Sequence, residues 1–253
     1  MTAPYRYLPV LLPIFLTALS AQDKQLFGRV TFPLGNVQIL VRPNPGWGKA
    51  IMNQDVFVGD RIRTAPKSRC EITLDGGGKV RIAEKSELQL TAASVTPLQK
   101  DFGATIFSGQ VWVAAKAAFG ETRNVAIRAP TAVAAIRGTK FRTIADTAES
   151  SVLVYEGNVD VIWAQAGDGG QQGDGGTGAP DPIRIGPPQE VAPPEEVPGP
   201  YEVSLEDWIT LVEGMQINVR SDGRYNLFEF DQATDDQLEF VRWNKDLDQQ
   251  QGE

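Results

Sequence analysis

The chain offers few side chains that could carry out catalysis. It has no histidine and a single cysteine, Cys70, among its 253 residues. The lack of histidine excludes Ser-His-Asp and Cys-His nucleophile pairs, histidine general bases and every histidine-bound metal. A single cysteine excludes an intrachain disulfide and cysteine-based zinc clusters. We therefore expect a protein that is not an enzyme, with no metal site and no cofactor.

Pairs of neighbouring carboxylates are the remaining candidates for acid–base chemistry. They occur at Glu195/Glu196, Glu206/Asp207 and Asp235/Asp236. Each pair lies in a linker-like segment or at the start of an expected helix, where solvation or the helix dipole is a sufficient reason for the charge. Cys70 begins an alternating strand pattern, which predicts a buried and inert thiol.

Two residues stand out as candidates for ligand binding. Trp47 lies between two glycines in an expected loop, where an exposed indole could stack on a sugar. Arg137 could contact a ligand, but a structural role in holding a turn is favoured, because a buried guanidinium needs a carboxylate or several carbonyls. Glu156 is the most attractive partner for that guanidinium. Trp112 and Trp163 lie within strand patterns and are expected in the core.

Two glycine-rich stretches lack the context that a ligand-binding loop needs. Residues 75–78 read Asp-Gly-Gly-Gly and lie between two strand patterns. A phosphate-binding loop leads into a helix, so these residues predict a hairpin turn instead. Residues 167–178 lack the nonapeptide period of calcium-binding glycine repeats, which disfavours calcium.

The charge is unevenly distributed along the chain. Residues 1–189 carry 20 Lys and Arg against 16 Asp and Glu, a net of +4, whereas residues 190–253 carry 4 against 16, a net of −12. An acidic C-terminal segment argues against nucleic-acid binding, because phosphates need clustered cations. The acidic segment could also fold back on the net-positive part as an intramolecular cover.

The N-terminus has the layout of a secretory signal peptide over residues 1–21. One positive charge precedes an apolar run of about 12 residues, and small residues follow it. Cleavage fits after Ser20 or after Ala21. The run is shorter than the roughly 20 residues that a membrane-spanning helix needs. We expect an exported protein, periplasmic or extracellular, that does not span the membrane after cleavage.

Residues 27–163 have the pattern of an all-β domain. Short runs of β-branched and aromatic residues, bounded by Gly, Pro and Asp, start roughly every 10–15 residues with no helical pattern between them. This spacing predicts a sandwich, barrel or β-roll of many short strands. Two separate strands are expected around Ser108–Gly109. Glu156–Gly157 is expected to close the last strand pair as a tight turn.

Alternation along these strands buries every second residue. The predicted core consists of Ile62, Ile72, Leu74, Val80, Ile82, Leu88, Leu90, Ile106, Val111, Val113, Val125, Ile127, Phe141, Val152, Val154, Val159 and Val161.

The remainder of the chain divides into a linker and a small mixed segment. Residues 164–200 hold nine glycines and eight prolines in 37 positions, which is linker composition. Residues 201–253 form the acidic C-terminal segment. In it, residues 204–212 fit either a helix or a strand, residues 215–220 alternate like a strand, and residues 235–248 predict one short helix.

That helix is expected to be amphipathic. Leu238, Val241 and Leu247 would share one face, and Asp235 and Asp236 at its start would suit the helix dipole.

Five blocks in the middle of the chain resemble the FecR domain family. They lie at residues 59–64, 69–76, 109–113, 129–141 and 155–159, and the resemblance covers about residues 56–163. The motif positions are Gly59, Asp60, Thr64, Gly109, Pro130, Arg137, Gly138, Thr139, Phe141, Glu156 and Gly157. One departure is Ala129, where the family usually has Thr before the proline. Glycine at position 138 is expected where φ is positive or where no side chain fits.

The resemblance implies an extracytoplasmic all-β module of bacterial envelopes. The name-giving members add a cytoplasmic helical segment that controls a sigma factor, then a transmembrane helix, and they receive a signal from an outer-membrane iron transporter. This chain has an expected signal peptide in their place, so only the envelope module carries over. We expect a binding module whose partner is an envelope protein, such as an outer-membrane transporter or a membrane regulator. The alternative is a wall-associated structural protein that binds glycan through Trp47.

Overall fold

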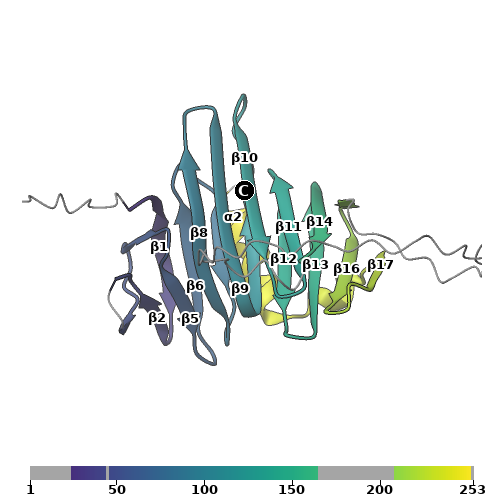
Figure 1. The fold of residues 1–253 in the computed structure, drawn as a ribbon, viewed down its shortest axis with the longest axis horizontal. Coiled ribbons are helices and arrows are strands. Elements are labelled where there is room, and N and C mark those ends of the chain that lie inside the picture. Colours follow the sequence, from purple (N-terminus) through teal and green to yellow (C-terminus); the bar gives the residue numbers. More distant parts are fainter. Residues whose placement is uncertain (1–23, 44–45, 165–207, 252–253) are drawn as a thin grey trace, which may run out of the picture.

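The computed structural model describes residues 24–43, 46–164 and 208–251. The expected signal peptide and residues 165–207, which include nearly all of the expected linker, lie outside the described residues and stay predictions. The described residues form a β-structure of many short strands with two helices at the C-terminal end, which confirms the all-β class (Figure 1). Neither of these helices is long and apolar enough to cross a membrane.

The strands form two sheets that share one long strand. Sheet A has the order β4 (Asp55–Phe57), β1 (Leu26–Leu34), β6 (Arg69–Leu74), β7 (Lys79–Ile82), the second half of β9 (Gln99–Ala114), β12 (Lys140–Ala145), β13 (Glu149–Glu156), β16 (Met215–Arg220) and β17 (Tyr225–Glu229). Every pair of neighbours in this sheet is antiparallel.

Sheet B contains the first half of the shared strand. Its order is β3 (Trp47–Lys49), β2 (Val37–Leu40), β5 (Arg61–Thr64), β8 (Glu87–Val95), β9, β10 (Thr122–Arg128), β11 (Ala132–Arg137), β14 (Asn158–Trp163) and β15 (Ile209–Val212). The β9–β10 pair is parallel and the other pairs are antiparallel.

Strand β9 passes from one sheet to the other at Gly109. Ser108 still pairs with β8 in sheet B, whereas Gly109 already pairs with β12 in sheet A. The φ angle of Gly109 is +90°, and a Cβ built on it would lie 2.2 Å from Oγ of Ser86. The prediction of two separate strands here was wrong, because a glycine in this conformation bends one continuous strand instead of ending it.

A second change of sheet occurs at Gly157, which has a φ of +83°. The expected tight turn at Glu156–Gly157 was to join a pair of hydrogen-bonded strands. In the structure β13 pairs with β12 and β16 in sheet A, while β14 pairs with β11 and β15 in sheet B. That pairing prediction was therefore wrong: the turn carries the chain between sheets.

The core lies between the two sheets. Every core residue predicted from alternation is buried, with at most 2% of its surface exposed. Cys70 belongs to the same cluster, and burial raises the pKa of its thiol to about 12. The prediction of a buried thiol is thus confirmed, and a raised pKa disfavours the thiolate, which is the reactive form.

The glycine-rich turn at residues 75–78 joins β6 and β7, as predicted. Gly76, Gly77 and Gly78 all have positive φ angles. The carbonyl oxygen of Gly76 accepts hydrogen bonds from Lys100 Nζ at 3.0 Å and from Arg123 Nη2 at 2.8 Å. These contacts tie the turn to β9 and β10, which gives the stretch a structural role.

The C-terminal segment completes both sheets. Residues 209–212 are a strand, β15, which settles the ambiguity at residues 204–212 for the part that the structure describes. The expected strand at residues 215–220 is β16, which pairs with β13. The C-terminal segment and the preceding β domain therefore share their sheets.

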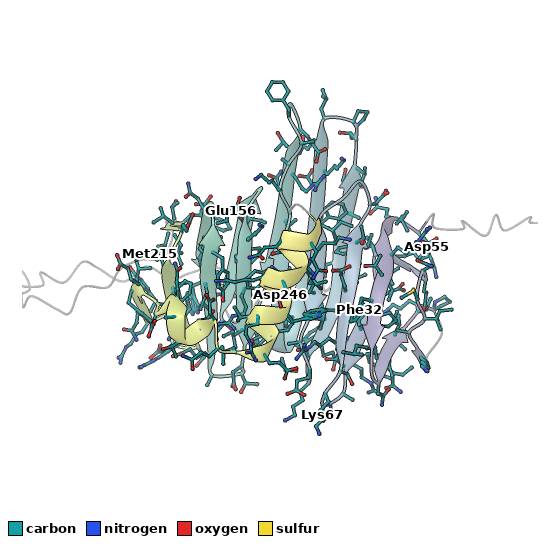
Figure 2. All side chains as sticks on the ribbon, turned by 180° about the vertical axis from the view of Figure 1, so that it is seen from behind. Phe32, Asp55, Lys67, Glu156, Met215 and Asp246 are labelled. Carbon is teal, nitrogen blue, oxygen red and sulfur yellow. The ribbon has the colours of Figure 1, made fainter. Side chains whose placement is uncertain are left out.

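Two helices replace the single helix expected at residues 235–248. They are α1 (Gln232–Asp235) and α2 (Glu239–Gln251). Leu238 precedes α2 and is 48% exposed, so its predicted place on the buried face was wrong, whereas Val241 is fully buried. Figure 2 shows α2 lying over the outer face of sheet A. The acidic segment thus covers part of the preceding domain, as its charge suggested.

Replacing Gly109 with alanine should strongly destabilise the fold. The new Cβ would meet the backbone and side chain of Ser86 in a φ region that non-glycine residues avoid. We expect a loss of about 2–4 kcal/mol in the free energy of unfolding, measured by urea denaturation. Gly48→Ala is the control, because the nearest atom to its built Cβ is 3.9 Å away. Equal losses in both variants would contradict the assigned role of Gly109.

Candidate functional site

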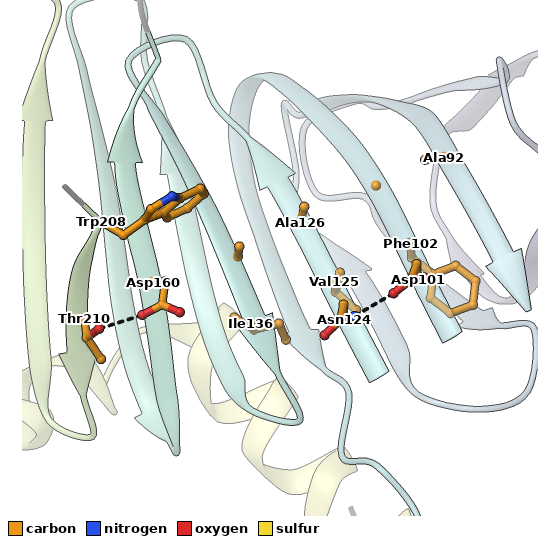
Figure 3. A pocket seen from close by; sticks show the side chains of 12 residues that line it. Ala92, Asp101, Phe102, Asn124, Val125, Ala126, Ile136, Asp160, Trp208 and Thr210 are labelled. Carbon is orange, nitrogen blue, oxygen red and sulfur yellow. Dashed lines mark hydrogen bonds between the residues drawn. The ribbon is translucent and has the colours of Figure 1, made fainter. Parts of the chain in front are cut away.

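A groove crosses the outer face of sheet B. Its floor is one cross-strand row of small residues, formed by Ala92, Gly103, Ala126 and Ala135 on β8, β9, β10 and β11. Larger side chains flank this row, so the small residues leave a hollow of about 680 Å³. This hollow is the candidate binding site (Figure 3).

Polar side chains line the groove along one side and at one end (Figure 3). Beside the floor row, on β9 and β10, Asn124 Nδ2 donates to Asp101 Oδ1 at 2.6 Å. At the β15 end Thr210 Oγ1 donates to Asp160 Oδ1 at 2.6 Å, and this pair continues the row of small residues onto β14 and β15. A ligand with hydroxyl or amide groups would find both acceptors and donors here.

Trp208 supplies the aromatic surface of the groove. It lies immediately before β15, lines the hollow beside Asp160 and Thr210, and is 49% exposed. A half-exposed indole next to carboxylate and hydroxyl groups can stack on a flat apolar ligand face while its neighbours bind polar groups. From the sequence, Trp208 was one of five tryptophans that could stack on a sugar, and Trp47 was preferred because glycines flank it.

Trp47 does not lie in the expected loop. It is the first residue of β3 at the far edge of sheet B, and it is only half-buried. The guanidinium carbon of Arg63 lies 4.2 Å from the centre of its ring, so one ring face is covered by a cation–π contact. Trp47 is separate from the groove residues, and its role as a sugar platform stays a prediction.

Arg137 is the last residue of β11, where its backbone pairs with that of Asn124. Its side chain lies outside what the structure describes, so both of its predicted roles stay predictions. Glu156, the partner proposed for it, forms ion pairs with Lys140 at 3.0 Å and Lys116 at 3.4 Å. The hydrogen bond and charge of Lys140 are the main reason that the pKa of Glu156 is lowered.

The glycine, aspartate and threonine of the first block hold a turn. Gly59 has a φ of +95°, and Asp60 accepts a hydrogen bond from the Phe57 backbone N–H at 2.9 Å. Burial raises the pKa of the Asp60 carboxyl. Thr64 Oγ1 donates to the Ala83 carbonyl at 2.6 Å and accepts from the Ser86 N–H at 3.0 Å.

The central block is also placed at turns and in the core. Pro130 lies between β10 and β11, and Gly138 has a φ of +69°, as its predicted role requires. Thr139 is buried against the position of Gly157, and Phe141 is in the core. The described motif side chains thus position strands and are not among the residues that line the groove.

The outer face of sheet A contrasts with the open groove, because it carries buried charges under the C-terminal helices. Arg81 Nε lies 2.7 Å from Glu71 Oε2, and a second nitrogen of Arg81 contacts Asp248 of α2. Arg142 pairs with Asp235 of α1. Asp235 was expected only to suit the helix dipole, but its carboxylate is nearly buried and ion-paired. The helix-dipole explanation is therefore insufficient.

Comparison with known proteins finds a family similarity in the central part of the chain. Residues 60–160 match the model of the FecR family, described as "FecR protein". This part of the chain is therefore similar to a FecR domain, in agreement with the resemblance of its sequence blocks. No curated protein matches the chain.

Two solved structures also resemble the chain. Both are crystal structures of "a putative anti-sigma factor from Parabacteroides distasonis ATCC 8503", one at 1.65 Å and one at 2.50 Å resolution. Their identities are 15% and 16%, and each has a TM-score of 0.42 over 68% of this chain. The match spans only 60% of those longer chains. At this identity and score, the two structures carry no conclusion about the function of this chain.

The buried ion pairs of sheet A predict a loss of stability in acid. Burial alone would raise the pKa of Glu71, but hydrogen bonds from Thr31 and Arg81, with the charges of Arg81 and Lys79, lower it below its ordinary value of 4.5. The stability that Glu71 contributes is therefore present above its unfolded-state pKa and is lost as the pH falls through its folded-state pKa.

Glu71→Gln should lower the free energy of unfolding at pH 7 by about 3 kcal/mol, because Arg81 keeps a buried charge with one anion fewer. The variant should also lose stability less steeply than the wild type below pH 4.5. Urea denaturation at several pH values measures both effects. Glu149→Gln, which removes an exposed partner of Arg220, is the control. An acid slope that is the same in all three proteins would refute this role for Glu71.

Proposed function

We propose that this chain is an exported FecR-domain protein that works as a non-catalytic binding module of the bacterial envelope. The groove of sheet B is its contact surface, and the module is the sensing part of a signalling system. The N-terminal signal-peptide pattern supports export to the periplasm or beyond. The FecR domain supports a signalling role.

The observation that carries the proposal is the contrast between the two outer faces. The centre of sheet A is covered by α2, whereas the groove across sheet B is open and lined by mixed polar and apolar groups. An open hollow with a few converging polar groups is the usual form of a binding site. A partner segment in this groove would meet a smooth floor at Ala126 and Ala135, with hydrogen-bonding groups along one side and at the β15 end.

The partner class follows from the family resemblance: an envelope protein, either an outer-membrane transporter or a membrane regulator. The experiment is cross-linking in cells that produce the full chain with its N-terminal signal, followed by purification and mass spectrometry. We expect such a protein to be recovered, with cross-links that map to β10, β11 and β14. Recovery of wall polymer alone would contradict the proposal.

Filling the groove should abolish this contact. Ala135→Trp places an indole on the floor of the hollow while leaving the buried face of β11 unchanged. We expect at least a tenfold loss of cross-linked partner with an unchanged unfolding curve. Ala118→Trp makes the same change at an exposed position outside the groove and should retain the partner. Equal recovery with both variants would show that the groove is not the contact surface.

A second candidate function is glycan binding, and Trp208 specifically favours it. Its exposed indole lies beside Asp160 and Thr210, which is the combination of a stacking surface and hydrogen-bonding groups that sugars need. In this reading the protein is a wall-associated structural protein, and the site is at Trp208 rather than at Trp47.

Substitution of each tryptophan distinguishes a glycan site at Trp208 from one at Trp47. If soluble peptidoglycan fragments bind the full chain in calorimetry, Trp208→Ala should weaken the affinity roughly tenfold or more, which corresponds to about 1.4 kcal/mol. Trp47→Ala should leave it unchanged, because one face of that ring is covered by Arg63. The opposite ranking would move the site to Trp47, and no binding by the wild type would reject the glycan reading.

A further inference from the structure

The outer face of sheet A carries two buried arginines on either side of a tryptophan. Register places Arg81 of β7 beside Trp112 of β9, and Trp112 beside Arg142 of β12. All three side chains are at most 2% exposed. We call this row the two-arginine face. It is unusual, because buried guanidinium groups are costly unless anions and acceptors surround them.

Each arginine receives one carboxylate from the C-terminal helices. Asp248 of α2 contacts Arg81 and accepts a hydrogen bond from Trp112 Nε1 at 3.2 Å. Asp235 of α1 contacts Arg142 and accepts a hydrogen bond from the Tyr155 hydroxyl at 2.6 Å. Each aspartate therefore contacts one guanidinium group and accepts one hydrogen bond from an aromatic side chain. The two carboxylates are bound by the same combination of groups.

The contact combines a small apolar cluster with charge and hydrogen bonding. The buried side of α2 presents Phe240 and Val241 to that cluster and Asn244 and Asp248 beside them. A helix of 13 residues is marginal in water on its own, so α2 depends on this face for its stability.

The contact leaves hydrogen-bonding capacity unused. Within the described part of the chain, Arg81 Nη2 and Arg142 Nε and Nη1 are buried and have no hydrogen-bond partner. On the helix, Asn244 Oδ1 is also buried without one. Such unpaired groups cost free energy, so a segment that supplied more acceptors to the arginines could compete with the helices that cover them.

We propose that the two-arginine face is a helix-binding site that residues 232–251 occupy in cis. The partner that it accepts in trans is an acidic amphipathic helix of another protein, which displaces α2. Charge complementarity selects this partner class, because two buried guanidinium groups require carboxylates. The site is independent of the sheet B groove, so either proposal can fail without the other.

The chain's own sequence supplies the probe for this site. A fluorescein-labelled peptide of residues 231–251 is titrated with full chains, and binding is read by fluorescence anisotropy. The chain variant Asp235→Asn/Asp248→Asn loses the charges that hold the cover, so it should bind the peptide at least tenfold more tightly than the wild type. A peptide with the same two substitutions should not bind.

Charge removal alone is controlled by the variant Asp222→Asn/Asp246→Asn, which alters two exposed aspartates of the same segment. This chain should bind the peptide no better than the wild type. Equal peptide affinity for all three chains, or equal binding of the acidic and the substituted peptide, would overturn the proposal.

Hydrogen exchange on the wild-type chain keeps the proposal testable if the double variant does not fold. Amides of α2 should exchange at least tenfold faster than those of β9 and β12, and excess unlabelled peptide should accelerate exchange in α1 and α2 but not in the strands. If α2 exchanges only at the rate of β9, the cover opens only by global unfolding, and the proposal is wrong.

Discussion

The bend of β9 at Gly109 is the constraint on which the two outer faces depend. Before the bend, the outward residues of β9 belong to sheet B, and Gly103 among them forms part of the groove floor. After the bend, the outward residues belong to sheet A, and Trp112 among them lies between two arginines. One strand therefore links the open groove to the covered face, and the positive φ of a single glycine sets their relative orientation.

The local pattern of the sequence predicts much of the fold. Every residue that alternation placed in the core is buried, because a strand has only two sides and the core takes one of them. The pairing of strands was less accessible, since hydrogen bonding between β13 and β16 joins distant residues. The wrong prediction at Glu156–Gly157 has the same cause. The residues of a turn show that the chain reverses there, but they do not show which sheet the next strand joins.

The candidate site was less predictable than the fold. Ala126 and Ala135 define the groove only when they lie side by side, and single alanines in a sequence give no sign of a hollow. Asp235 and Asp248 read as ordinary helix charges until the structure brings them over Arg142 and Arg81. The uneven charge of the chain was the one sequence signal of this contact. It indicated that the acidic C-terminal segment is attracted to the preceding domain, but not which residues form the ion pairs.

The C-terminal strands have a consequence for dissecting the protein. The family match ends at residue 160, yet β13 and β14 each use one hydrogen-bonding edge to pair with β16 and β15. A chain cut after β14 would leave rows of unpaired backbone groups on both sheets, and such exposed edges template aggregation. Strands β15 and β16 therefore cover these two edges, and a unit that keeps the edges paired extends beyond the family boundary.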